Sequence, residues 1–214
     1  MRLNRNLLCN ASAAFLFAAG VLFVATPSAV GAEAEKPAIS GNDIPKGKQT
    51  TLGLYVNAAK AYEMWKAAPD KVRIIDVRTP EEFAFVGHPE MAWNIPLAFV
   101  TYERKGGKFQ YAPKPNTAFV AQVREIAKPN DVLLVTCRSG GRGAMAVNQL
   151  AAAGFTNAYN IVDGIEGDVI NDPQSVYHGK RMKNGWKNSA PWVYDIDPEK
   201  VILEEGAATG FTPK

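Results

Sequence analysis

Residues 131–143 read DVLLVTCRSGGRG, and this stretch decides the fold class. Residues 131–136 are a β-rich run that predicts a buried strand. The glycines that follow predict a tight turn. Beyond them, apolar residues recur at helical spacing, at Ala144, Val147, Leu150 and Ala151. Strand, turn and helix in this order form the unit of a parallel sheet, and ligands bind in the loops at the carboxyl ends of its strands.

The same alternation of strands and helices extends to both sides of this stretch. The expected elements are a helix with Ala61, Met64, Trp65 and Ala68 on one face, strands at 72–77, 92–95 and 158–162, and a helix over 119–127 that Asn116 or Thr117 would cap. Strands separated by helices of about ten residues predict an α/β fold, with a mostly parallel central sheet flanked by helices on both faces. Residues 99–115 fit this pattern less well and are expected to form a surface excursion.

The N-terminal region has the composition of a secretory signal peptide. Arg2 and Arg5 precede an uncharged apolar stretch, and small residues at 30–32 suit a signal peptidase. We therefore expect a signal peptide over residues 1–32 and a periplasmic protein that meets the membrane only during export. An uncleaved membrane anchor is the alternative. The expected remainder is a linker (33–52), a domain (53–170) and an aromatic and basic C-terminal extension that packs on the domain (171–214).

Charge and cysteine content limit the function classes. The chain has 214 residues and a net charge of +3, and removal of Arg2 and Arg5 would lower this charge to +1. So small a charge gives no basis for nucleic-acid binding. Cleavage would also remove Cys9 and leave Cys137 without a disulfide partner. A lone thiol in an oxidising compartment is either buried and inert or chemically employed.

The neighbours of Cys137 favour a chemical role. Glycines let the backbone turn its N–H groups inward, and the start of a helix adds positive potential. Arg138 and Arg142 add two permanent charges. The loop therefore favours the thiolate and would hold an anion above the sulfur.

The Cys137 loop has four alternative interpretations: a phosphate-binding loop, a zinc site, a catalytic Cys–His pair and a structural turn. A phosphate-binding loop would need a Lys followed by Ser or Thr, and none is present. A zinc site would need more ligands than one cysteine, His88 and His178. A catalytic Cys–His pair with either histidine and a purely structural glycine turn both remain alternatives.

Several motifs around the loop resemble those of the rhodanese family. Residues 74–83 (IIDVRTPEEF) are similar to the first family signature, and Gly87-His88 and residues 94–96 (NIP) match the elements that follow it. Cys137 to Arg142 is similar to the active-site loop of single-domain sulfurtransferases, and residues 163–167 (DGIEG) resemble the closing Gly-Gly turn. The chain departs from the family pattern at residues 89–91 and at Asp163, which concerns local turn geometry.

The resemblance implies a sulfurtransferase that forms a persulfide on Cys137. Its donor would be a small anion such as thiosulfate, and its acceptor cyanide, a thiol or another exported protein. No cofactor and no metal are implied. The implied active-site loop is Cys137, Arg138, Ser139, Gly140, Gly141, Arg142 and Gly143.

The resemblance also implies roles for the flanking residues. Arg138 and Arg142 would bind the anionic donor or the leaving sulfite. Asp76 and Arg78 are expected to brace the sheet edge near the loop, and His88 is expected to be structural.

Alternative functions on the same fold are a sulfur relay, a partner-binding module without catalysis, and phosphatase or arsenate reductase chemistry. Cys137 to Arg142 spans six residues, whereas the loops of the related phosphatases and arsenate reductases span seven. Gly143 stands where their arginine would lie. In the extension, a basic cluster beside Trp186 is either a docking surface or a solvated face; it comprises Lys180, Arg181, Lys183 and Lys187.

Overall fold

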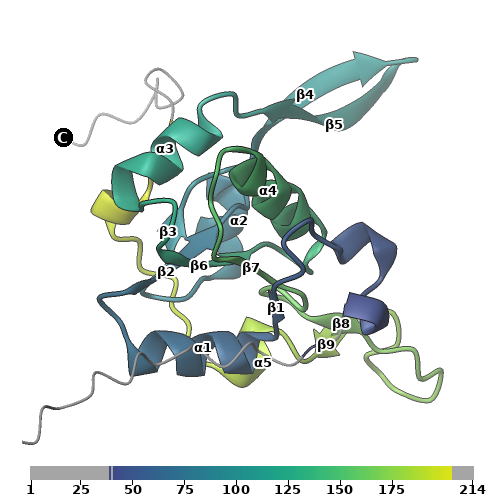
Figure 1. Cartoon of the computed structure of the whole chain (residues 1–214). Coiled ribbons are helices and arrows are strands. Elements are labelled where there is room, and N and C mark those ends of the chain that lie inside the picture. The colour runs from purple at the N-terminus through teal and green to yellow at the C-terminus, as the bar shows by residue number, and fades with distance from the viewer. Residues whose placement is uncertain (1–38, 40, 204–214) are drawn as a thin grey trace, which may run out of the picture. The chain divides into compact units, whose positions relative to one another are not determined.

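The computed structural model describes residue 39 and residues 41–203 (Figure 1). Its centre is a five-stranded sheet in the order β1-β7-β6-β2-β3, and every neighbouring pair is parallel. The strands are β1 (Tyr55–Val56), β2 (Val72–Asp76), β3 (Trp93–Asn94), β6 (Val132–Thr136) and β7 (Ala158–Ile161). The predicted α/β architecture with a parallel central sheet is confirmed.

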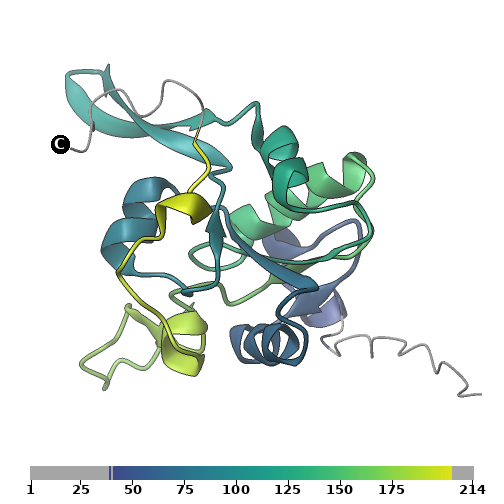
Figure 2. The same ribbon diagram turned by 90° about the vertical axis from the view of Figure 1, so that its left-hand side faces the viewer.

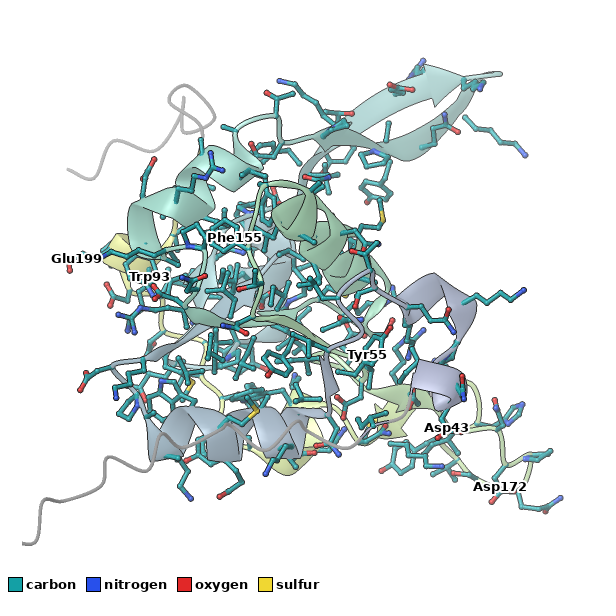
Figure 3. All side chains as sticks on the ribbon, in the orientation of Figure 1. Asp43, Tyr55, Trp93, Phe155, Asp172 and Glu199 are labelled. Carbon is teal, nitrogen blue, oxygen red and sulfur yellow. The ribbon has the colours of Figure 1, made fainter. Side chains whose placement is uncertain are left out.

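Helices cover both faces of this sheet, because successive side chains of a strand point to opposite sides. On one face, Ile75, Leu133 and Val135 pack against α3 (Phe119–Ile126) and α4 (Gly141–Ala152). On the other face, Ile74 and Leu134 pack against α1 (Ala58–Ala67), Phe83 of α2 (Pro80–Val86) and Trp186 of α5 (Trp186–Ser189). Figure 2 shows the helices distributed around the sheet, and in Figure 3 Phe155 lies on the α3 and α4 side.

The segment expected to be a surface excursion, residues 99–115, lies in a β-hairpin. β4 (Ala98–Lys105) and β5 (Lys108–Pro115) pair antiparallel, and Gly106-Gly107 make the two-residue turn with positive φ angles of 58° and 77°. Two-residue hairpin turns favour such glycine pairs, so Gly106-Gly107 is the sequence signal for this hairpin.

Asn116 does not cap α3 directly. Its side chain accepts a hydrogen bond from Ala118 N–H, ahead of the helix.

Residues 41–52 belong to the folded body and differ in this from the expected linker. They contain two 3-10 turns, Gly41–Asp43 and Lys46–Lys48, and the side chain of Ile44 is buried. Lys48 Nζ donates to the carbonyl oxygen of Val162 at 2.8 Å, and Asn160 Nδ2 donates to the Lys48 carbonyl at 2.9 Å.

The predicted signal peptide, residues 1–32, lies outside the described residues. Within the described part, no helix is long and apolar enough to cross a bilayer.

The described part of the C-terminal extension packs on the sheet domain. Its β9 (Arg181–Lys183) pairs with β8 (Asp168–Val169), and Trp186 at the start of α5 is fully buried. Asp163 binds this segment. One of its carboxylate oxygens accepts from Gly185 N–H and the other from Ala58 N–H, at 2.9 and 2.8 Å. The carboxylate thus fastens α1 and the extension to the loop after β7.

Candidate active site

The last residues of three parallel strands lie side by side at the carboxyl ends of the strands. Asp76 at the end of β2 pairs in register with Thr136 of β6 and Asn94 of β3. The loop of Cys137 to Gly140 follows β6 directly and leads into α4. The chemistry-bearing loop therefore lies at the edge where parallel sheets bind ligands.

The loop holds the Cys137 thiol inside a ring of backbone. Cys137 is 1% exposed, and its Sγ accepts a hydrogen bond from Gly140 N–H at 3.2 Å. Gly140 has a φ of 94°, and a Cβ there would overlap the carbonyl oxygen of Val162. A Cβ at Gly143 would overlap Asn160 Oδ1. Both positions therefore require glycine for the loop to close around the sulfur.

Several backbone N–H groups of this loop are free to bind a ligand. Among the described residues, no protein acceptor faces the N–H groups of Arg138, Ser139, Gly141 and Arg142. The last two belong to the first turn of α4, where N–H groups have no intrahelical partner and the helix dipole is positive. Unpartnered donors around a buried sulfur can bind an anion or a sulfur that carries negative charge.

The turn after β7 is hydrogen-bonded to the backbone of the Cys137 loop. Ile165 N–H donates to the Cys137 carbonyl at 2.8 Å, and Glu166 N–H donates to the Arg138 carbonyl at 3.0 Å. Gly164 has a φ of 62° and lies so close to Cys137 and Ser139 that a Cβ would be about 2.5 Å from the Cys137 carbonyl oxygen. This contact explains the glycine of the closing turn.

Arg142 does not face the space above the sulfur as a free cation. Its guanidinium forms two hydrogen bonds with the carboxylate of Glu82, at 2.6 and 2.7 Å. Burial raises the pKa of Glu82, but the hydrogen bonds and charge of Arg142 outweigh it and hold that pKa below its ordinary value. The same hydrogen bonds raise the pKa of Arg142. Arg142 therefore fixes the start of α4 against α2, and its expected role in binding the donor stays a prediction.

Glu82 is the site residue to which the sequence analysis gave no role. It lies in the quoted 74–83 signature and also closes a capping box, because its carboxylate accepts from Thr79 N–H while the Thr79 hydroxyl accepts from Glu82 N–H. The spacing of Thr79 and Glu82 is the sequence signal of that box. No local signal shows that Arg142, far along the chain, supplies the second partner.

Arg138 is the cation of the loop that remains accessible. Its side chain is 51% exposed, and its Nε lies 4.0 Å from the carboxylate of Glu166. Ser139 is half-buried beside it. An anion at the mouth of the loop would therefore meet Arg138 first.

Asp76 and Arg78 form a fully buried ion pair beneath the loop. Arg78 Nη2 lies 2.6 Å from Asp76 Oδ2 and also donates to the carbonyl oxygen of Gly87 at 2.9 Å. Its Nη1 donates to the Glu82 carbonyl. The pair thus braces β2 against α2. His88 stacks on Phe83 with ring centroids 3.5 Å apart, and burial lowers its pKa, so the ring is neutral at pH 7.

The described residues contain no cluster of three or more His, Cys, Asp or Glu side chains that could hold a metal ion.

A sequence model of the rhodanese-like domain matches residues 58–169, just over half of the chain. The chain belongs to the rhodanese family. The matched segment includes the whole sheet except β1, together with the Cys137 loop and Glu82.

Relatives of this rhodanese differ in how much of their length is matched. Thiosulfate sulfurtransferase 16 from Arabidopsis thaliana is 39% identical over 92 residues, which cover 43% of this chain and 69% of that protein. The senescence-associated protein DIN1 of Raphanus sativus is 37% identical over 42% of this chain and 44% of its own length. An uncharacterized protein of Rickettsia conorii is 30% identical over 64% of this chain and 94% of its own.

A solved structure supports the same fold. The crystal structure of Rv0390 from M. tuberculosis is 28% identical in sequence, with a TM-score of 0.50. The match covers 65% of this chain and 96% of that one.

Proposed function

We propose that this rhodanese transfers a sulfane sulfur from thiosulfate or a persulfide donor to a thiophilic acceptor through a persulfide on Cys137. The observation that carries the proposal is the buried Cys137 sulfur at the start of α4, which accepts a hydrogen bond from Gly140 N–H in a loop whose other N–H groups have no protein acceptor among the described residues. A buried structural cysteine would need no such donors, because a thiol is a weak hydrogen-bond acceptor.

In the first half-reaction the Cys137 thiolate attacks the outer sulfur of the donor. With thiosulfate the balance is Cys137–S⁻ + ⁻S–SO₃⁻ → Cys137–S–S⁻ + SO₃²⁻, so one S–S bond forms and one breaks. The N–H groups of the loop and the start of α4 stabilise the negative charge on the bound outer sulfur. The exposed guanidinium of Arg138 attracts the anionic donor and stabilises the negative charge of the leaving sulfite.

In the second half-reaction a nucleophile removes the outer sulfur. The persulfide anion takes up a proton from solvent, and a thiolate RS⁻ then attacks the outer sulfur of Cys137–S–SH and gives RS–SH and the Cys137 thiolate. Two such displacements are each easier than direct transfer between donor and acceptor, as in other forms of nucleophilic catalysis. A persulfide on Cys137 also explains why the sulfur is shielded from solvent, since bulk water and oxidants are kept away.

The same geometry argues against phosphatase or arsenate reductase chemistry. Gly143 stands seventh in the loop and packs against Asn160, so it offers no guanidinium. Arg142 is bound to Glu82 and is not available to a transferring phosphoryl group.

Intact mass spectrometry after incubation with thiosulfate tests the proposal. We expect the mass of one sulfur atom to be added, and we expect cyanide or dithiothreitol to remove it. In Cys137→Ser the gain should be abolished while the folded circular dichroism spectrum is retained, because a hydroxyl is a poor nucleophile without a base. An unmodified wild-type protein, or a Cys137→Ser variant that still turns over thiosulfate and cyanide, would contradict the mechanism.

We also propose that the protein is exported and acts in the periplasm. The support is the basic start, the apolar stretch of residues 11–25 and the small residues at 30–32. N-terminal sequencing of the mature protein should begin near Glu33. Recovery of residues 1–10 from membrane pellets would indicate an anchor instead.

A further inference from the structure

A groove of about 530 Å³ lies between the end of α2 and the C-terminal extension. We call it the extension groove. Most of its lining comes from residues after the family match ends at residue 169. Its lining includes Phe85, Glu166, Arg181, Met182, Lys187 and Trp192.

The extension groove adjoins the catalytic loop. Glu166 lies in the groove, and its backbone and carboxylate both face Arg138, at 3.0 and 4.0 Å. Lys187 N–H donates to the carbonyl oxygen of Ile165, whose own N–H donates to the Cys137 carbonyl. Two backbone hydrogen bonds therefore connect the groove wall with the residue that would carry the persulfide.

The groove carries a net positive charge, since its lining holds Arg181 and Lys187 against the single carboxylate of Glu166, whose charge also acts on Lys187. Arg181 Nη1 donates to the Gly167 carbonyl and Lys187 Nζ to the Val86 carbonyl, both at 2.8 Å. Neither cation has a carboxylate within ion-pair distance in the described part of the chain. The groove's own carboxylate, Glu166, is the neighbour of Arg138. Partial burial also lowers the pKa of Lys187, so a carboxylate brought beside it would stabilise its charge.

Apart from Asn188, the remaining lining of the groove is apolar. Lys187 Nζ lies 4.1 Å from the centroid of the Trp192 ring. Phe85 and Met182 stand at the rim with 82% and 46% of their surface exposed. Two cations set among apolar side chains suit a ligand that combines carboxylates with a short aliphatic frame.

We propose that the extension groove binds the carboxylates of the sulfur acceptor, a small thiol that carries one or more carboxylate groups. This proposal rests on the proposed persulfide chemistry and adds the acceptor's class to it. With its carboxylates at Arg181 and Lys187, the acceptor directs its thiolate towards the loop. The thiolate then takes the outer sulfur from Cys137–S–SH, and Cys137 leaves as the thiolate.

The size of the groove and the burial of the sulfur favour a small acceptor over a protein. A volume of about 530 Å³ falls within the usual range for small ligands, about 300–1,000 Å³. Cys137 is 1% exposed, so the attacking thiol must enter a narrow opening. An acidic segment of a protein is the competing occupant of the groove, and the experiment separates the two.

The test loads the full-length mature protein with thiosulfate and then measures the rate of persulfide loss against acceptor concentration. The acceptors are 3-mercaptopropionamide, 3-mercaptopropionate and mercaptosuccinate, compared at equal thiolate concentration. We expect the half-saturation concentration to fall about tenfold from the amide to the dicarboxylate, the equivalent of about 1.4 kcal/mol. Equal values for the three thiols would overturn the proposal and leave the groove to an acidic protein segment.

Two variants locate the selectivity. Arg181→Gln should lower the ratio of half-saturation concentrations, amide to dicarboxylate, from about tenfold to about threefold, because Lys187 still binds one carboxylate. Lys183→Gln, on the same strand but exposed and outside the groove, should leave that ratio unchanged. An unchanged ratio in Arg181→Gln would assign the selectivity to another site and overturn the proposal. A failure of persulfide loading itself would count against the proposed function, and it is measured separately, before any thiol is added.

Discussion

Glu82→Gln is the change that best tests whether Arg142 fixes the loop through its pair with Glu82. The substitution keeps the shape of the side chain and removes its charge, so the guanidinium loses a carboxylate that now accepts two hydrogen bonds. Removing one partner of a fully buried ion pair costs about 3–5 kcal/mol, whereas exposed pairs contribute about 1 kcal/mol or less. The Arg142 and Glu82 side chains are 33% and 26% exposed. We therefore expect the free energy of unfolding to fall by about 2 kcal/mol, between these limits.

The effect of this substitution should depend on pH. The pKa of Glu82 is lower in the folded protein than the value of about 4.3 in an unfolded chain. Its ionised form therefore stabilises the fold fully above the unfolded pKa, and this stabilisation is lost as the pH falls through the folded pKa. The difference between wild type and Glu82→Gln should be constant from about pH 6 to 8 and shrink below about pH 4.

Urea unfolding at several pH values measures both effects, and persulfide loading measures the consequence for the loop. We expect loading by thiosulfate to slow about tenfold, because small misplacements of positioning groups have large effects on rate. Glu63→Gln is the matched comparison, since Glu63 pairs with Lys66 on the exposed surface of α1, and it should change stability by less than about 0.5 kcal/mol. If Glu82→Gln matched Glu63→Gln in stability and in loading rate, Arg142 would not be fixing the loop.

Two further substitutions test other parts of the site. Gly140→Ala should abolish persulfide loading in the intact mass spectrum, because its φ of 94° and its close carbonyl neighbour leave no room for a Cβ; Gly107→Ala, also at positive φ but with open space around it, should lower stability by about 1 kcal/mol and leave loading intact. Asp163→Ala should lower the free energy of unfolding by about 2–4 kcal/mol, since it leaves the N–H of Gly185 and the first N–H of α1 without an acceptor. The fluorescence of Trp186 should then shift to longer wavelength in the folded protein as the extension loosens, and an unchanged spectrum and stability would show that Asp163 does not fasten it.

The parts of the fold that rest on local pattern could be predicted from the sequence. Apolar β-rich runs gave β2, β6 and β7 close to their observed bounds, because these strands are buried on both faces. The loop position followed from the order of strand, glycine turn and helix. The family signature around residues 74–83 then placed the loop within a known architecture.

The parts that depend on distant partners could not be predicted in the same way. The segment around Lys48 contains prolines and glycines typical of a linker, yet Lys48 binds the end of β7 more than a hundred residues later. The sequence around Arg142 contains no signal that its guanidinium pairs with the carboxylate of Glu82. Asp163 looked like a departure from a glycine, but its carboxylate accepts two N–H groups from separate segments. In each case the deciding interaction joins residues with no mutual signal in the sequence.

The order of strands in the sheet also sets when the chain can fold. β1 lies at the N-terminal end of the domain, and its only neighbour in the sheet is β7, where Tyr55 pairs with Asn160. During synthesis, β1 emerges before β7 and stays unpaired with it until β7 follows. Pairings between such distant segments form slowly, because the long intervening loop must close first. Pairing of β1 with β7 is therefore expected to be a late step in the folding of the sheet, although β1 is the first of its strands to be made.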